Sequence, residues 1–322
     1  MNLVHVHLWL NHLPILGTLI TLALFVVSLA FDREDLKQAS LALFVVIALF
    51  AIPAYMSGSA ALKQLQDENP DLSMDAIQAH QGSALMAFIF IELTGAVSLL
   101  GLWRFSRSEK NPWMERPAKW HLAIVLVLAV ATAGLAAIAG NTGGEIRHAE
   151  IAAGPGPTAV IGEFGFKLTT FVQHMVIDSS MWVWPILEDL HFIGLILIIG
   201  AFGALNVRVL GMMKQLPLAP LHRFIPWGIA GFFINIVTGL LFFMGMPGFY
   251  TPNVVFQVKM FTIMLAGLNL LLFQCTSAFR SLEHLGPGED APLYAKIVAA
   301  SSIFLWIAAI VLGRYIPFGE VS

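Results

Sequence analysis

The chain has 322 residues, of which 58% are hydrophobic and only 11% are charged, and its mean hydropathy is +0.80. A soluble domain carries about 25% charged residues, so this composition excludes an ordinary soluble protein. The net charge of −3 and the lack of a basic patch give no support for nucleic-acid binding. Cys275 is the only cysteine, which excludes an intrachain disulfide, a four-cysteine iron–sulfur site and covalent attachment of c-type haem.

Long apolar stretches predict transmembrane helices, because a span needs roughly 20 mostly apolar residues and lipid offers backbone groups no other partner. We predict eight spans, at about 8–30, 39–62, 78–103, 119–140, 182–212, 222–247, 254–279 and 294–316. The segment before the first span lacks the basic residues of a signal peptide, so this span is expected to be retained. We expect an all-α integral membrane protein whose eight transmembrane helices form two four-helix bundles.

The distribution of lysine and arginine predicts the orientation in the membrane. The loops that join spans 1–2, 3–4, 5–6 and 7–8 carry twelve of these residues, whereas the opposite side carries four. Since basic loops stay in the cytoplasm, both termini are predicted to lie outside.

Glycine and proline residues between Gly143 and Pro157 mark a break in the chain. We predict a four-helix membrane module over 1–151, an outer linker over 152–181 and a second four-helix module over 182–322. Within the linker, residues 166–177 are expected to form an interfacial helix. Both modules enter the membrane from the same side, which excludes the inverted repeats of many transporters.

Histidines gather at the predicted outer end of the first module. The set contains His5, His7, His12, His80 and His148. Ionisable residues in a membrane usually have a function, and neutral imidazole binds metal ions and haem iron.

A site for haem b would use two of these histidines as axial ligands. His12 on the first span and His80 on the third lie at matching depths, while His7 and His148 would supply a second pair or support the first. Arg147 suits a haem propionate, because guanidinium matches carboxylate geometry. A copper or zinc site is the alternative for the same residues, and simple interfacial placement is the third reading.

Four further ionisable residues fall within predicted spans. Glu188 and His191 share a helix face at i,i+3 spacing, which fits either a cofactor-binding histidine with an orienting carboxylate or an interfacial ion pair. Lys259 lies at a similar depth, so we predict an ion pair with Glu188. Glu92 has no obvious cation and suggests a proton relay.

Two sets of motifs resemble uncharacterised bacterial membrane families. The first set, over 1–151, is His5-x-His7, Leu10-Asn11-His12-x-Pro14-x-x-Gly17, Ile52-Pro53, Ser57-Gly58, His80 and Gly143-Gly144-Glu145-Ile146-Arg147-His148, and it resembles a four-span family. The second, over about 174–275, is Trp182-x-x-Pro185-x-x-Glu188-x-x-His191, Arg208-x-x-Gly211, Thr238-Gly239 and Asn253-x-x-Phe256-x-x-Lys259, and it resembles a multi-span family. The second resemblance implies that Glu188, His191 and Lys259 act as a set.

These observations favour a b-type cytochrome-like subunit of the bacterial inner membrane. It would pass electrons between the quinone pool and an outer carrier such as a c-type cytochrome, as one subunit of a membrane oxidoreductase. The alternatives are a copper-binding or copper-transport membrane protein and a structural anchor for a larger redox complex.

Overall fold

A computed structural model of the chain describes residues 3–68, 72–108, 117–146, 157–275, 282 and 285–319. Within these ranges the chain is helical and contains no strand. Eight of the described helical segments are long and apolar enough to cross a membrane: His7–Ala30, Glu34–Glu68, Met74–Phe105, Lys119–Glu145, Val183–Val209, His222–Gly245, Val254–Leu272 and Leu293–Phe318. The prediction of a multi-span helical membrane protein is confirmed. The sidedness of the membrane stays a prediction.

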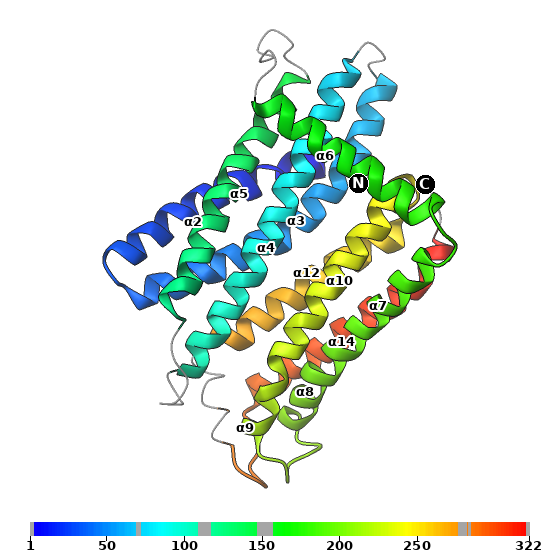
Figure 1. Cartoon of the computed structure of the whole chain (residues 1–322). Coiled ribbons are helices and arrows are strands. Elements are labelled where there is room, and N and C mark those ends of the chain that lie inside the picture. Colours follow the sequence, from blue (N-terminus) through cyan, green and yellow to red (C-terminus); the bar gives the residue numbers. More distant parts are fainter. Residues whose placement is uncertain are drawn as a thin grey trace. The chain divides into compact units, whose positions relative to one another are not determined.

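The helices keep the order of the predicted spans (Figure 1). The longer ones are α1 (Leu3–Leu10), α2 (His12–Ala30), α3 (Glu34–Glu68), α4 (Met74–Ser108), α5 (Lys119–Glu145), α6 (Pro157–Gln173), α7 (Val183–Ile198), α10 (Ile225–Gly245), α12 (Val254–Cys275) and α14 (Leu293–Tyr315). Shorter pieces are α8 (Ala204–Val209), α9 (Leu218–Leu221) and α11 (Pro247–Tyr250), and π-helical turns cover His174–Asp178 and Ile199–Gly203.

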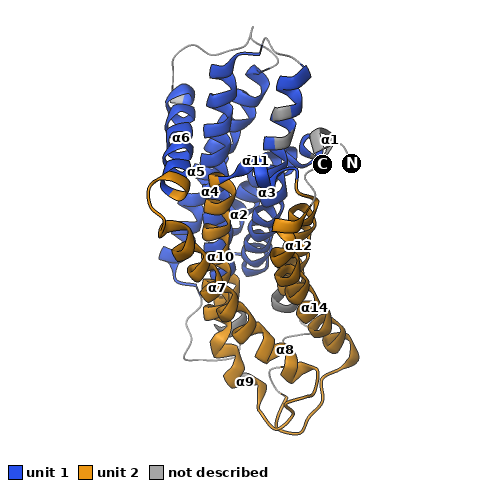
Figure 2. Cartoon of the chain, turned by 90° about the vertical axis from the view of Figure 1, so that its right-hand side faces the viewer, with its two compact units in different colours: residues 1–101, 115–175, 246–252 blue, residues 102–114, 176–245, 253–322 orange. Residues whose placement is uncertain are grey.

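The chain separates into two compact units (Figure 2). Unit 1 comprises Met1–Gly101, Glu115–Met175 and Met246–Pro252, and unit 2 comprises Leu102–Met114, Val176–Gly245 and Asn253–Ser322. Each unit therefore contains four of the candidate spans. Helix α6, from the predicted linker, belongs to unit 1.

In unit 1, helices α1 and α2 pack against α3, and α2 also packs against α5. A short turn joins α2 to α3, where Asp32 adopts a left-handed conformation (φ 50°) and its carboxylate pairs with Lys37. Helix α6 begins at Pro157 rather than at residue 166, since proline suits the first turn of a helix. It approaches α4 closely, because Gly162 and Gly165 lie directly against the backbone at Ala79 and Gly82.

In unit 2, helix α7 packs against α10, and α12 packs against α14. Small residues bring α7 and α10 together, since an added methyl group at Gly194 would lie 2.9 Å from the backbone oxygen of Gly231. Close approach at small residues is typical of helix pairs in membranes. The α12–α14 pair is held by polar bonds, in which Asn269 donates to Ser301 (2.6 Å) and to the carbonyl of Val298 (3.3 Å).

Candidate functional site

His7 is held in unit 1 against helix α3. Its Nδ1 lies 3.0 Å from the carbonyl oxygen of Ala54 and 3.2 Å from the hydroxyl of Ser57. The ring rests on Gly58, where an added methyl group would lie 3.1 Å from His7 Cε1. The imidazole therefore fills a space that only glycine leaves open on this face of α3.

His80 is held on helix α5 in the same way. Its Nδ1 lies 3.1 Å from the carbonyl oxygen of Ala139 and 3.4 Å from the hydroxyl of Thr142. The ring rests on Gly143, where an added methyl group would lie 3.0 Å from His80 Cε1. Both histidines thus dock on a serine- or threonine-glycine pair of a neighbouring helix, with a helical carbonyl one turn earlier.

A third histidine, His191 in unit 2, repeats most of this arrangement on helix α10. Its Nδ1 lies 2.7 Å from the hydroxyl of Thr238, and its Cε1 lies 3.8 Å from the position of a methyl group at Gly239. The phenyl ring of Phe242 meets the imidazole edge-to-face at 5.9 Å. Ser57-Gly58 and Thr238-Gly239 stand among the sequence motifs, but the motifs alone do not show that these pairs hold histidine rings.

The hydrogen-bond pattern assigns the tautomer of all three histidines. The hydroxyls of Ser57, Thr142 and Thr238 each donate their only proton to a carbonyl oxygen of their own helix, at 2.8 to 3.0 Å. Each hydroxyl oxygen can then only accept from histidine, so the ring carries its proton on Nδ1. The Nε2 lone pair remains available to a ligand. Metal- and haem-ligating histidines are oriented in this manner, through the nitrogen that does not bind the metal.

The α3 segment on which His7 docks meets the helix of His80, since Tyr55 of α3 stacks on Phe88 of α4 at 4.7 Å. Asn11 follows His7 by one helical turn, and its side-chain oxygen is buried without a partner among the described residues. His12 differs, because its ring is exposed and its Nδ1 bonds to the carbonyl oxygen of Leu8 in the preceding turn (3.0 Å). The structure therefore brings His7, rather than His12, into the bundle near His80.

Several residues of the predicted set cannot be placed. Arg147 and His148, together with the side chain of His5, lie outside the described part of the chain. Among the side chains that are described, no three histidine, cysteine or carboxylate groups converge on a point where they could hold a metal ion.

The predicted pairing of Glu188 with Lys259 is absent from the described contacts. Glu188 is exposed and accepts a hydrogen bond from the indole Nε1 of Trp184, one turn earlier in α7 (3.0 Å). The side chain of Lys259 lies over helix α14, with Nζ 3.1 Å from the position of a methyl group at Gly313. Phe256, one turn before Lys259, stacks on Phe243 of α10 at 5.9 Å, and His191 bonds to Thr238 of the same helix, so α10 lies between the two residues.

Glu92 is buried in helix α4, and its Oε1 has no partner among the described residues. Phe88 and Gly95 share its helix face, and both contact α3. The ring of Phe88 stacks on Tyr55 at 4.7 Å, and Gly95 lies against Ala48. The carboxyl therefore faces α3 within the bundle. This position agrees with a polar function inside the membrane.

Unit 2 also holds a small polar cavity of about 20 Å³, which is large enough for one water molecule. Its polar lining consists of the side chains of Asn206, Asn269 and Ser302. Asn206 donates a hydrogen bond to Ser302 at 2.9 Å. We interpret the cavity as part of the interhelical hydrogen bonding that holds α8, α12 and α14 together.

The sequence analysis missed the role of Arg208, which it counted only as a basic loop residue and a motif position. The side chain is fully buried and donates to the carbonyl oxygens of Leu216, Gly286 (2.9 Å) and Glu289 (3.3 Å). The arginine thereby ties the loop after α8 to the loop before α14. Gly211, three residues later, has a φ of 93°, which explains the Arg-x-x-Gly spacing.

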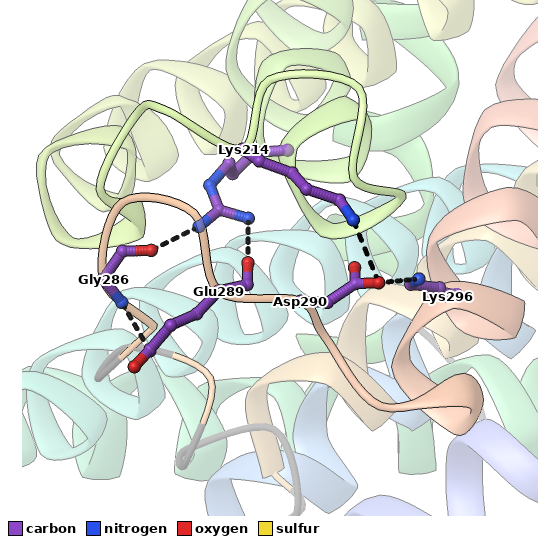
Figure 3. Close-up of polar contacts among 6 residues, drawn as sticks. Lys214, Gly286, Glu289, Asp290 and Lys296 are labelled. Carbon is purple, nitrogen blue, oxygen red and sulfur yellow. Dashed lines mark hydrogen bonds and ion pairs between the residues drawn. The ribbon is translucent and has the colours of Figure 1, made fainter.

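Asp290 in the same loop bonds to Lys296 at 2.8 Å and to Lys214 at 3.1 Å (Figure 3). These two hydrogen bonds, from Lys296 first and then Lys214, lower the pKa of the Asp290 carboxyl to about 2. Asp290 and Lys214 are exposed to solvent, so these ion pairs position the loop more than they stabilise the fold.

Comparisons of the chain with family models, with curated proteins and with solved structures found no match. The functional assignment therefore stands on the geometry of the side chains.

Proposed function

We propose that the chain is a membrane electron-transfer subunit that holds haem b between His7 and His80. The observation that carries the proposal is the shared docking of these two rings, which fixes Nδ1 on a helical carbonyl and leaves Nε2 free. A bis-histidine haem needs this donor set, with two neutral imidazoles from different helices of a bundle. Bound there, haem would supply reversible one-electron transfer.

Haem is favoured over copper or zinc by the number of ligands. Haem iron takes only two axial ligands from the protein, and the two oriented histidines are sufficient. A zinc site takes three or four protein ligands, and copper sites also draw on several side chains.

The proposal extends to location and partners. We place the chain in the bacterial inner membrane, with the histidine pair near the outer surface that the positive-inside rule predicts. Electrons would pass between the quinone pool and an outer carrier such as a c-type cytochrome. The chain would then serve as one subunit of a membrane oxidoreductase.

The test is the optical spectrum of the purified full-length chain from haem-replete cells. We expect the reduced-minus-oxidised bands of low-spin haem b, and haem extractable as pyridine haemochrome. His7→Ala and His80→Ala should each remove these bands. His12→Ala is the matched control and should keep them, because its ring is exposed and bonded within its own helix.

Glycine variants give a finer test. Gly58→Ala and Gly143→Ala would place a methyl group 3.1 and 3.0 Å from the ligand rings, so we expect about a tenfold loss of haem affinity, the size typical of changes that disturb ligand orientation. Gly134→Ala is the control, since nothing lies within 4 Å of its added methyl group. A colourless wild-type protein, or one that binds copper without haem, would overturn the proposal.

A further inference from the structure

Lys259 is a cation inside a candidate membrane span. Among the described residues it has neither a hydrogen bond nor an ion pair, and its Nζ lies over Gly313 of α14. An unpaired charge at such a depth is costly and usually marks a binding site or a transport path. The ammonium group therefore needs a partner that the described chain does not supply.

His191 presents the complementary group. The bond of Nδ1 to Thr238 Oγ1 (2.7 Å) and the bond of that hydroxyl to Ile234 (2.8 Å) leave His191 with a free acceptor at Nε2. Phe256, one helical turn before Lys259, stacks at 5.9 Å on Phe243 of α10, one turn after the Gly239 on which His191 docks. A donor cation from α12 and a neutral acceptor from α7 thus lie near each other in unit 2.

The surroundings of this pair are aromatic. Phe242 contacts both the imidazole of His191, at 5.9 Å, and the indole of Trp184, at 4.8 Å. Flat apolar surfaces of this kind favour a planar ring as the ligand. The polar groups would then hold a substituent on that ring.

We propose that His191 and Lys259 bind the phenolic hydroxyl of a quinol, with its proton donated to His191 Nε2 and its oxygen accepting from Lys259 Nζ. One hydroxyl satisfies both groups, since it is a donor and an acceptor at once. A carboxylate or phosphate oxygen has no proton to donate to Nε2. It would therefore meet the Nε2 lone pair with a lone pair of its own. The inference rests on the proposed function, because it locates the quinol that the proposed electron transfer requires.

The test is anaerobic titration calorimetry of the full-length chain in phosphatidylcholine nanodiscs, with decylubiquinol as the probe. The wild type should bind with saturation at one site. His191→Gln and Lys259→Met should each weaken binding by about tenfold or more, the loss expected for a hydrogen bond to a charged or buried group. Lys167→Met is the control and should bind as the wild type, because this exposed lysine pairs with Glu163 on α6 in unit 1.

A second pair of variants tests the position of the ammonium group without removing it. Gly313→Ala would place a methyl group 3.1 Å from Lys259 Nζ and should weaken quinol binding. Gly200→Ala should not, since nothing lies within 4 Å of its added methyl group. This pair keeps the inference testable if Lys259→Met fails to fold.

Two results would overturn the inference. One concerns affinity: either both His191→Gln and Lys259→Met bind as tightly as the wild type, or the wild type itself shows no saturable binding. The other is loss of quinol binding when phosphatidylglycerol replaces phosphatidylcholine, which would identify an anionic headgroup as the occupant. The titration requires no haem, so the two proposals can fail separately. A colourless protein that binds decylubiquinol contradicts only the haem proposal. A protein that contains haem but does not bind decylubiquinol contradicts only this inference.

Discussion

At the scale of single residues, the informative groups are the hydroxyls that hold the histidines. Imidazole has two nitrogens, and its use as a ligand or base depends on which one carries the proton. In this chain a serine or threonine next to a glycine makes that choice three times, for His7, His80 and His191. The hydroxyl fixes the proton and the glycine provides space for the ring.

This arrangement predicts that the hydroxyl of Thr238 matters more for holding His191 than the hydroxyl of Thr142 does for holding His80. Among the described residues, His191 Nδ1 bonds to Thr238 alone, at 2.7 Å, so Thr238→Val should release the tautomer and weaken decylubiquinol binding by about tenfold. Thr142→Val should cost less haem affinity, because the carbonyl oxygen of Ala139 still accepts from His80. Titration calorimetry and haem content measure the two effects. A larger loss in Thr142→Val than in Thr238→Val would contradict this account.

At the scale of helices, the sequence predicts the elements well and their contacts poorly. Apolar length determines each span, so all eight were predictable. The face that a histidine turns toward the bundle depends on which neighbouring helix offers a partner. Spacing favoured His12, but helix α3 provides Ala54, Ser57 and Gly58 to His7. Depth likewise suggested that Glu188 meets Lys259, yet a tryptophan one turn away satisfies the carboxylate.

The loops that join helices in unit 2 depend on Arg208. A buried guanidinium with three carbonyl acceptors cannot be replaced by lysine, whose single nitrogen lacks the planar fork. Arg208→Lys should therefore destabilise the protein by on the order of 3 kcal/mol, since the buried cation loses most of its hydrogen bonds. Thermal unfolding in detergent, followed by circular dichroism, measures the change in Tm. Lys214→Met, which removes an exposed ion pair with Asp290, is the control and should change Tm little.

At the scale of the whole molecule, the proposed haem site and the proposed quinol site belong to different units. Unit 1 holds His7 and His80, and unit 2 holds His191 and Lys259. The composition and the break near residues 141–181 were sufficient to expect two four-span modules. The chemistry of each site was not predictable to the same degree, because it depends on hydrogen bonds between residues 47 to 62 positions apart in the sequence.

The orientation of the whole molecule is the last prediction. Twelve lysines and arginines lie on the side of the loops that join odd spans to even spans, against four on the other side. Translocation of basic loops is disfavoured, and short loops near span ends carry most of this effect. Reporter fusions after residues 70 and 150 should therefore report an exterior location, and a fusion after residue 110 a cytoplasmic one. The reverse pattern would place both sites near the cytoplasmic surface, where an outer-side carrier could not reach a haem held by His7 and His80.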